Sequence, residues 1–361
     1  MAGSFRTSTG LGQSARLCYL ALKAQGMDVK AIDLTDAFMQ PLDYSSEDLL
    51  FEDSCDGYGT LILHVNAPLI PLALTLLGMN TVANKYVIGY WAWELLTVPP
   101  EWKHGVKAVH EIWVPSRFCA ESIRSIAEDR VVRVIPHPVL AGPVARKSEQ
   151  QARGPFTVLT VVNAASSLTR KNPGAALQAF QEAFADDDDC RLILKISHAD
   201  EAKDLMEFLT KIGGTRVEVI RRLGSSTEVT SLIESADVVL SLHRSEGFGL
   251  VMAEAMCAGV PVVATDWSGN SDYLDQSNGI PVPCKMVPAR DPQKIYDYPD
   301  TFWAEPDTVA AEKALRALKD SPQLREKLGR AAANQAQMLW SSERYARLVR
   351  KALHLEIEAS I

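Results

Sequence analysis

The chain has 361 residues, of which 47% are hydrophobic and 23% charged, and this composition excludes a disordered or fibrous protein. Its formal net charge at pH 7 is -8. Because broad nucleic-acid binding requires a basic face, nucleic acid is not expected as a partner. The length accommodates two domains of ordinary size.

The first half of the chain alternates short β-rich runs with helical patterns, which is typical of parallel βαβ units. A helix is predicted over Ser14–Ala24, followed by Gly26 as a C′ glycine. A strand before this helix would be short, covering only Met1–Phe5. Further strands are predicted at Val29–Leu34, Thr60–Val65, Tyr86–Trp91, Glu111–Val114 and Val131–Ile135.

Residues 141–155, with the sequence AGPVARKSEQQARGP, are polar and contain two prolines and two glycines. They lack periodic apolar positions, which predicts a linker. After them the alternation restarts, and from Asp307 onward the pattern is helical throughout. The predicted strands of this half are Phe156–Val162, Arg191–Ile196, Arg216–Ile220, Asp237–Leu242 and Val260–Thr265.

These elements predict an α/β protein with two Rossmann-like domains, an N-terminal one over residues 1–145 and a C-terminal one over residues 155–335. A C-terminal helix within residues 340–361 is expected to pack back on the first domain. The ligand site is expected in a cleft between the domains, where the carboxyl ends of parallel strands meet. Fold alone does not determine function, so the prediction of activity depends on particular residues.

The most informative segment runs from Ser241 to Asp272, where a predicted strand leads through a glycine-rich loop into a predicted helix. Glycines at such a turn let the backbone approach a ligand, and the free N–H groups of a helix start favour an anion. Glu246 lies in the loop and Glu254 about one turn into the helix. Each carboxylate can accept two hydroxyl hydrogen bonds, as a sugar or ribose diol offers. The pattern predicts a site for a nucleotide sugar.

The sequence EGFGLVMAEAMCAGVPVVATDWSGN, which begins at Glu246, closely resembles the Glu-x7-Glu signature of retaining glycosyltransferases of family four (glycosyltransferase group 1). These enzymes have a GT-B fold and transfer a sugar without a metal or other cofactor. The resemblance implies that Glu246 acts at the reacting carbon and that Glu254 holds the ribose. It also implies that one backbone stretch lies against the sugar and diphosphate, formed by Gly247, Phe248, Gly249 and Leu250.

Cationic candidates lie in the sequence TRKNP, which starts at Thr169. When no metal is present, cations and helix dipoles stabilise the negative charge that develops on a departing diphosphate. Family members carry an Arg and, several residues later, a Lys. Lys171 matches the Lys, and Arg170 is the candidate for the Arg, whose usual position falls near Ser166. The alternative for either residue is a solvated cation at a helix start.

Two glycines near the N-terminus, Gly10 and Gly12, lie in the sequence STGLGQSAR at the start of the first predicted helix. A lone Gly-x-Gly is weak evidence by itself. Family members have a glycine-rich loop there that approaches the diphosphate, and the resemblance therefore makes both residues donor-binding candidates.

The acceptor side is less well defined. Where many family members have a His-Asp pair, this chain has Trp91, Trp93 and Glu94. The Trp-x-Trp-Glu sequence resembles a subgroup of bacterial polysaccharide and lipopolysaccharide glycosyltransferases. Trp93 and Glu94 are candidates for an acceptor platform, since aromatic faces stack on sugars, with core packing as the alternative for Trp93. His64, which ends a predicted strand, is either an acceptor contact or a core histidine, and His137 is interpreted as structural.

The chain is predicted to move a hexose from a UDP- or GDP-sugar to a glycan or lipid-linked acceptor in polysaccharide or lipopolysaccharide synthesis. Two alternatives remain, a nucleotide-sugar epimerase of the same architecture and a catalytically silent binding protein. Met1–Arg16 lacks the apolar core of a signal peptide, and the longest apolar run, Ala67–Met79, is too short to span a bilayer. A cytoplasmic location is expected, with peripheral contact at the inner face of the membrane.

Overall fold

The computed structural model describes residues 1–45, 49–139, 154–202, 214–221 and 226–355. The chain divides into two compact units. Unit 1 comprises Met1–Leu140 with Met338–Ile361, and unit 2 comprises Ala141–Gln337. Residues 140–153, which cover most of the predicted linker, lie outside the described part of the chain. The predicted fold class is confirmed, because each unit is built on a six-stranded parallel sheet flanked by helices.

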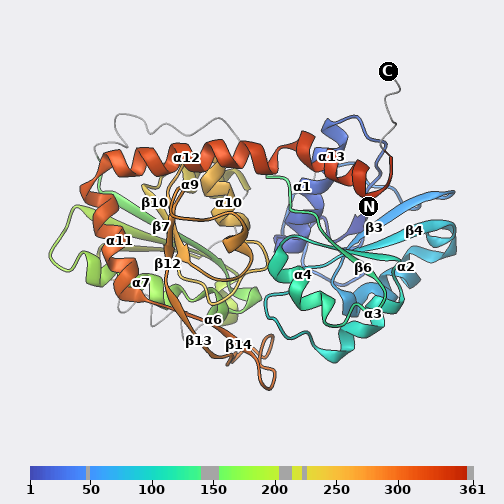
Figure 1. The fold of residues 1–361 in the computed structure, drawn as a ribbon, viewed down its shortest axis with the longest axis horizontal. Helices are drawn as coiled ribbons and strands as arrows, with labels where there is room; N and C mark the ends of the chain where they lie inside the picture. The colour runs from blue at the N-terminus through green and yellow to red at the C-terminus, as the bar shows by residue number, and fades with distance from the viewer. Residues whose placement is uncertain (46–48, 140–153, 203–213, 222–225, 356–361) are drawn as a thin grey trace. The chain divides into compact units, whose positions relative to one another are not determined.

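Unit 1 has the strand order β2-β1-β3-β4-β5-β6 (Figure 1). The strands are β1 (Ala2–Gly3), β2 (Ile32–Asp33), β3 (Gly59–His64), β4 (Lys85–Tyr90), β5 (Glu111–Val114) and β6 (Val131–Val134). The α-helices are α1 (Gly10–Ala24), α2 (Ile70–Val82), α3 (Lys103–Lys107), α4 (Arg117–Arg124) and α13 (Ser342–Ala352). Short 3-10 turns lie at η1 (Ala67–Leu69) and η2 (Pro100–Trp102).

The core of unit 1 lies between the sheet and the helices α1 and α13. Ile62 of β3 and Ile88 of β4 pair in register and share this core with Trp113 of β5 and Tyr345 of α13. Helix α13 is also joined to the residue after α1 by a hydrogen bond from Arg350 Nη2 to a backbone carbonyl at 3.0 Å. The C-terminal helix therefore packs within unit 1.

Two boundaries in unit 1 differ from the sequence-based prediction. Helix α1 begins at Gly10, one turn earlier than predicted, because the side chain of Thr9 accepts a hydrogen bond from Gly12 N and caps the helix. The strand predicted over Val29–Leu34 is reduced to Ile32–Asp33, which pairs with the equally short β1, and the preceding residue Ala31 forms an isolated bridge to Phe51.

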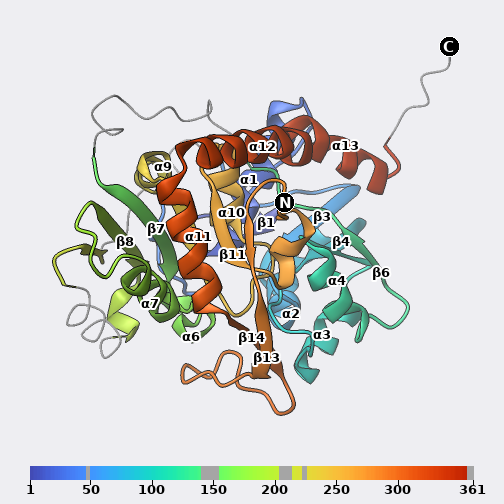
Figure 2. The ribbon, with the colours of Figure 1, turned by 60° about the vertical axis from the view of Figure 1, so that its left-hand side comes forward.

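Unit 2 has the strand order β12-β11-β10-β7-β8-β9 (Figure 2). The strands are β7 (Phe156–Asn163), β8 (Cys190–Ser197), β9 (Val217–Ile220), β10 (Val238–Ser241), β11 (Val262–Thr265) and β12 (Ile280–Val282). The α-helices are α6 (Leu168–Lys171), α7 (Pro173–Ala183), α9 (Ser226–Ser235), α10 (Leu250–Cys257), α11 (Thr308–Asp320) and α12 (Pro322–Trp340). Short 3-10 turns lie at η3 (Ala164–Ser166), η4 (Ala199–Ala202) and η5 (Ser268–Asp272).

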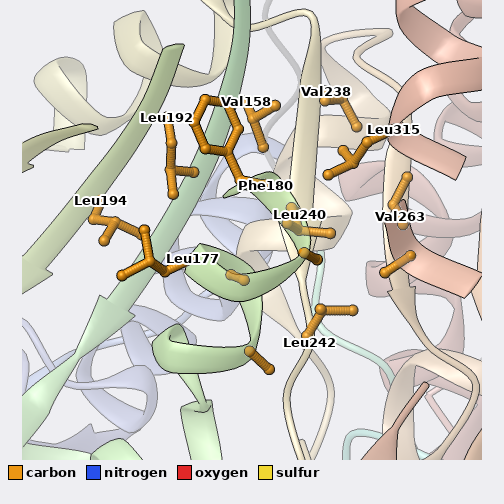
Figure 3. Close-up of a cluster of buried hydrophobic side chains, with 14 of the residues drawn as sticks. Val158, Leu177, Phe180, Leu192, Leu194, Val238, Leu240, Leu242, Val263 and Leu315 are labelled. Atoms are coloured by element: carbon orange, nitrogen blue, oxygen red, sulfur yellow. The ribbon is translucent and has the colours of Figure 1, made fainter. Parts of the chain in front are cut away.

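Helices α7 and α11 cover one face of the unit 2 sheet. Figure 3 shows Leu177 and Phe180 of α7 and Leu315 of α11 packed over strand residues that include Val158 and Leu240. The residues between these on the strands, such as Leu159 and Val239, are also buried, so both faces of the sheet are covered. Burial of both faces explains the nearly continuous apolar runs that predicted these strands.

An antiparallel hairpin, β13 (Cys284–Pro288) and β14 (Phe302–Pro306), follows the parallel sheet and was not predicted. β13 has no buried residue, whereas β14 has two buried neighbours, Trp303 and Ala304, so neither strand shows a regular alternation of apolar and polar residues. Residues 289–301 connect the two strands. In Figures 1 and 2 the hairpin projects from unit 2 on the side of α6.

The predicted helical region from Asp307 consists of three helices, with breaks at Ser321 and Ser341. Asp307 caps α11 by accepting hydrogen bonds from the N–H groups of Val309 and Ala310. None of the helices in the described part of the chain combines the length and the apolar character needed to cross a bilayer.

Candidate functional site

Glu246 and Lys171 lie against each other at the carboxyl edge of the unit 2 sheet. Glu246 is in the loop between β10 and α10, and Lys171 is the last residue of the short helix α6, which follows β7. Nζ of Lys171 lies 2.5 Å from Oε1 of Glu246. The structure thus brings together the two residues that were predicted to be catalytic.

Arg170 lies on the other side of the same carboxylate. Its Nη1 atom is 3.4 Å from Oε2 of Glu246 and donates a hydrogen bond to the carbonyl of Ser245 at 2.7 Å. Its Nη2 atom donates to the carbonyl of Ser166 at 2.9 Å. Arg170 is only 2% exposed. The guanidinium therefore lies beside Ser166, near which the family arginine was expected, but it is enclosed by protein atoms.

The two cations determine the ionisation of Glu246. Burial by itself raises the pKa of this carboxyl, but the charges of Lys171 and Arg170 outweigh burial and lower the pKa to about 2. Glu246 is thus an anion at neutral pH although only 8% of its surface is exposed. An anionic carboxylate accepts hydrogen bonds only, which suits contact with hydroxyl groups.

The backbone of Glu246 is held by the turn η5. The N–H of Glu246 donates to Oγ of Ser268 at 2.8 Å, and its carbonyl accepts from the N–H of Gly269 at 2.9 Å. Ser268 has a φ of 76°, which is unfavourable for a residue with a side chain. Backbone strain of this kind is often found at functional sites, where the surrounding structure maintains it.

Gly249 is the residue at which the loop turns into helix α10. Its φ is 90°, and a Cβ added there would lie 2.9 Å from the hydroxyl of Tyr273 and closer still to Met252. Only glycine fits this position without displacement. The Tyr273 hydroxyl donates to the carbonyls of Phe248 (2.8 Å) and Gly249 (3.0 Å), which directs these carbonyls into the protein.

The other predicted donor-binding residues surround this turn. Gly247 and Phe248 are buried in the loop, and Leu250 is the half-buried first residue of α10. Glu254 lies one turn into α10 and is half buried. The structure therefore places both acids of the Glu-x7-Glu pattern at one strand-to-helix turn. Their contacts with a donor remain predictions.

His243 and Asn270, which lie next to each other in this region, were not singled out from the sequence. His243 is fully buried, and its Nε2 lies 3.0 Å from Oδ1 of Asn270, while its Nδ1 lies 3.0 Å from Oγ of Ser241. Burial lowers the pKa of His243, partly opposed by the charge of Glu246. The contact between His243 and Asn270 connects the Glu246 loop to η5. The position of His243 directly before the glycine-rich turn is the sequence signal that could have identified it.

The hairpin supports the same loops from another side. Arg244 Nε donates to Oε2 of Glu305 on β14 at 2.8 Å, and its Nη1 donates to the carbonyl of Thr169 in α6 at 2.6 Å. The backbone carbonyl of Arg244 accepts from the N–H of Ala304 at 2.9 Å. Arg244 thus links the Glu246 loop, the Lys171 helix and the hairpin, a role that depends on contacts distant in sequence.

In unit 1, Gly10 and Gly12 both lie in the first turn of α1. Gly10 has open space around it, whereas a Cβ on Gly12 would lie within 2.7 Å of the carbonyls of Ser4 and Thr7. Gly12 therefore has a packing role, because it lets α1 approach the loop that follows β1. Contact of either glycine with a diphosphate remains a prediction.

His64 lies in a buried polar cluster at the carboxyl ends of β3 and β4. Oγ of Ser14 is 3.1 Å from Nδ1 of both His64 and His137, and the ring of His64 stacks on Tyr90 at 4.5 Å. Burial lowers the pKa of His64 well below its usual range and that of His137 to about 3, so both imidazoles are neutral at pH 7. Of the two interpretations of His64, the geometry shows the core histidine.

Trp93 is likewise a core residue. It is 6% exposed, donates its indole N–H to the carbonyl of Thr97 and packs on Trp102 at a ring distance of 5.1 Å. Trp91 is completely buried. Glu94 is half buried, and of these three residues it is the one whose acceptor role stays a prediction. The aromatic stretch therefore forms part of the unit 1 core instead of an open stacking surface.

Comparison with known proteins assigns the chain to a family. A model of the family described as family 4 glycosyltransferases in conflict systems matches residues 116–340, which is more than half of the chain. The chain is 30% identical to a D-inositol 3-phosphate glycosyltransferase of Paenarthrobacter aurescens (strain TC1) over 231 residues. The matched region makes up 63% of this chain and 45% of that protein. The chain thus spans less than half the length of this relative.

Solved structures share the fold along the whole chain. A glycosyltransferase from Rickettsia africae matches with a TM-score of 0.69 and 13% identity, covering 99% of this chain and 98% of that one. Anabaena HepE, crystallised with UDP and glucose, matches with a TM-score of 0.66 and 13% identity, covering 99% and 100%. At these identities the likeness shows the GT-B fold alone. The family model, which matches more than half of the chain, establishes that the chain belongs to the family 4 glycosyltransferases in conflict systems.

Proposed function

We propose that the chain transfers a hexose from a nucleoside-diphosphate sugar, with UDP- and GDP-sugars as candidate donors. The observation that carries this proposal is the ionised Glu246, held between Lys171 and Arg170 at a glycine-rich strand-to-helix turn. Family membership supports the activity, and the UDP and glucose bound to HepE support the class of donor.

Lys171 is proposed to change partners when the donor binds. Its side chain is 21% exposed, so a phosphate oxygen can approach the ammonium group from outside. The diphosphate would then compete with Glu246 for Lys171, and Glu246 would accept hydrogen bonds from sugar hydroxyls. As the bond between C1 and the diphosphate oxygen breaks, Lys171 and the free N–H groups at the start of α10 would offset the departing charge.

Glu254 is proposed to hold the ribose of the donor, because its carboxylate can accept both hydroxyls of a vicinal diol. Such a contact is the same in the ground state and the transition state, so it contributes to donor binding and not to the chemical step. Gly10 and Gly12 are proposed to approach the diphosphate. The support for these three assignments is the family resemblance together with the position of each residue in its helix.

The reaction is proposed to proceed with retention of configuration and without a metal. The acceptor hydroxyl would attack C1 from the face that the diphosphate leaves, and its proton would pass to the departing phosphate oxygen. The Glu-x7-Glu resemblance supports retention, and the cations around Glu246 support a metal-independent departure of the diphosphate.

The acceptor is proposed to be a glycan or a lipid-linked sugar, in polysaccharide or lipopolysaccharide synthesis, with Glu94 as a candidate contact. Peripheral contact with a membrane is proposed through helix α2. Leu72 and Leu76 lie on its exposed side, Met79 is exposed beyond the kink at Gly78, and no charged residue occurs between Ala67 and Asn84. Exposed lysines of the neighbouring α3 (Lys103 and Lys107) could meet anionic headgroups.

A panel of nucleotide sugars tests the proposed function. A donor present at 100 times its Kd adds about 2.7 kcal/mol of stability, which a thermal melt detects. The stabilising donor is then incubated with the protein, with and without EDTA, and nucleotide release is measured. Release that survives EDTA is expected. Absence of both binding and release across UDP- and GDP-sugars contradicts the proposal, and an epimerised donor formed without acceptor identifies an epimerase instead.

A further inference from the structure

The loop of the β13–β14 hairpin, residues 289–301, packs against the segment that carries Lys171. Helix α6 has four residues, Leu168–Lys171, and a helix of this length does not hold its own conformation in water. Its geometry must therefore come from its surroundings. Arg244 supplies part of it, and three side chains of this loop supply further contacts: Asp291, Gln293 and Tyr296.

Asp291 is the centre of these contacts. It is 1% exposed, and its carboxylate accepts hydrogen bonds from the backbone N–H groups of Gln293 (3.3 Å), Ile295 (3.1 Å) and Tyr296 (3.1 Å). These three bonds organise the loop itself. The fourth bond comes from Oγ of Ser167 at 2.9 Å, from a residue 124 positions away. The buried carboxylate thus joins the hairpin loop to the residue before α6.

Ser167 transmits this contact to α6. Its φ is 65° and its ψ is 103°, a conformation that is unfavourable for a residue with a side chain and persists only where the surrounding structure maintains it. While its hydroxyl donates to Asp291, the same oxygen accepts from the N–H of Arg170 at 3.1 Å and caps α6. Asp291 therefore holds the cap of the helix whose last two residues contact Glu246.

Gln293 and Tyr296 add contacts at either end of the segment. Oε1 of Gln293 accepts from the N–H of Leu168 at 2.7 Å, and its Nε2 donates to the carbonyl of Ala164 at 2.8 Å. The ring of Tyr296 lies 5.1 Å from the guanidinium carbon of Arg170. Each contact acts on the backbone or side chain of the Lys171 segment, and none of them reaches Glu246 directly.

We propose that Asp291, acting through Ser167, is a positioning residue that sets Lys171 and Arg170 against Glu246. The inference rests on the proposed function, since it assigns the hairpin loop a part in the reaction through Lys171. A misplacement of about 1 Å at a reacting group can lower turnover by about 100-fold. A contact that only stabilised the fold would instead lower the melting temperature and leave the site unchanged.

The first test follows the Glu246 carboxyl by carbon-13 NMR, assigned with Glu246→Gln, and needs no donor. In the wild type its pKa is lowered to about 2. In Ser167→Ala the pKa is expected to rise by about 1 unit or more, because an opposite charge close by lowers a carboxyl pKa by about 1–3 units. Gln293→Ala, at a less buried position, is expected to act in the same direction and guards against misfolding of Ser167→Ala.

Ser116→Ala is the matched control. Ser116 is also a fully buried serine that caps a helix, accepting from the N–H of Cys119 at 3.1 Å, but it belongs to α4 in unit 1. Its loss should lower stability and leave the Glu246 titration unchanged. If both Ser167→Ala and Gln293→Ala fold and titrate like the wild type, the positioning role is wrong, whatever their turnover.

Kinetics with UDP-glucose, followed by UDP release, separate this proposal from the proposed function. Ser167→Ala is expected to lower kcat by about 10-fold to 100-fold with a small change in donor KM. In a Lys171→Ala background the same substitution should have a clearly smaller effect, because the part of its effect that acts through Lys171 is already lost and only the part through Arg170 remains. Additive losses overturn the positioning role. A raised Glu246 pKa in Ser167→Ala, combined with normal turnover of Lys171→Ala, supports the positioning and contradicts the catalytic assignment of Lys171.

Discussion

Nζ of Lys171 lies 2.5 Å from Oε1 of Glu246, although the residues are 75 positions apart, one at the end of α6 and the other in the loop between β10 and α10. The pair joins the cation assigned to the departing diphosphate with the acid assigned to the sugar. Because Arg170 also approaches the carboxylate, Glu246 keeps a positive neighbour if Lys171 is withdrawn by a phosphate. The two roles can therefore be tested separately.

Lys171→Ala is expected to lower turnover by about 10²–10³, as removal of one group that stabilises developing negative charge does. The measurement is steady-state release of nucleotide from the donor. Lys319→Ala is a matched control, because Lys319 also pairs with a carboxylate, that of Asp187, and its side chain is similarly accessible (19%). Near-normal turnover of Lys171→Ala rules out the assigned role.

Glu254→Ala is expected to raise the donor KM more than it lowers kcat, since the ribose is held equally in the ground and transition states. Titration calorimetry with the nucleoside diphosphate should show the same loss of affinity. Glu312→Ala, which removes a partly buried helical carboxylate from α11, serves as the control. A pure fall in kcat with unchanged donor affinity would reverse the roles assigned to Glu246 and Glu254.

The stability of the protein should depend on Glu246 in acid. The folded pKa of this carboxyl is about 2, below its ordinary value of 4.5, so its contribution is complete above pH 4.5 and is lost as the pH falls towards 2. At 1.36 kcal/mol per pKa unit the full contribution is about 3 kcal/mol. Urea unfolding between pH 3 and 7 should show Glu246→Gln losing less stability on acidification than the wild type. Parallel curves would contradict the lowered pKa.

The buried histidines should make unit 1 sensitive to acid in a higher pH range. Burial lowers the pKa of His137 to about 3, so between pH 6.5 and 3 the unfolded chain binds a proton that the folded chain excludes. Stability is therefore greatest above pH 6.5 and declines towards pH 3. Thermal melts of His137→Asn should show a weaker dependence on pH across this range. His104→Asn, at an exposed position, should retain the wild-type dependence.

The apolar side of α2 gives a test of membrane contact. The double variant Leu72→Glu with Leu76→Glu is expected to lose sedimentation with vesicles that contain anionic lipid, because it places charges in the exposed apolar stripe. Met338→Glu changes an exposed apolar residue of α12 and should bind as the wild type does. If the wild type itself stays in the supernatant with anionic vesicles, the proposed contact is wrong.

Most of the strands and the glycine-rich turn at Glu246 could be predicted from the sequence because their signals are local. The inner strands of unit 2 are buried on both faces, which produces the apolar runs that located β7, β8 and β10 within one or two residues. The glycines around Glu246 signal a sharp turn because Gly249 needs a backbone conformation that side chains disfavour. The apolar runs and the glycine positions both lie within short stretches of sequence, so they can be recognised without knowledge of the tertiary structure.

The remaining features of the site were decided by tertiary structure. The hairpin has no periodic pattern, and its contacts with the Lys171 segment, such as the hydrogen bond that Ser167 donates to Asp291, join residues 124 positions apart. Burial of His64 and Trp93 depends on how helices and loops cover the sheet edge, which short sequence windows do not report. The sequence alone thus determined the family, most of the strands and the strand-to-helix turn that carries Glu246 and Glu254. Only the folded chain determined that Lys171, Arg170 and Glu246 meet, because long-range contacts are set by packing and not by local propensity.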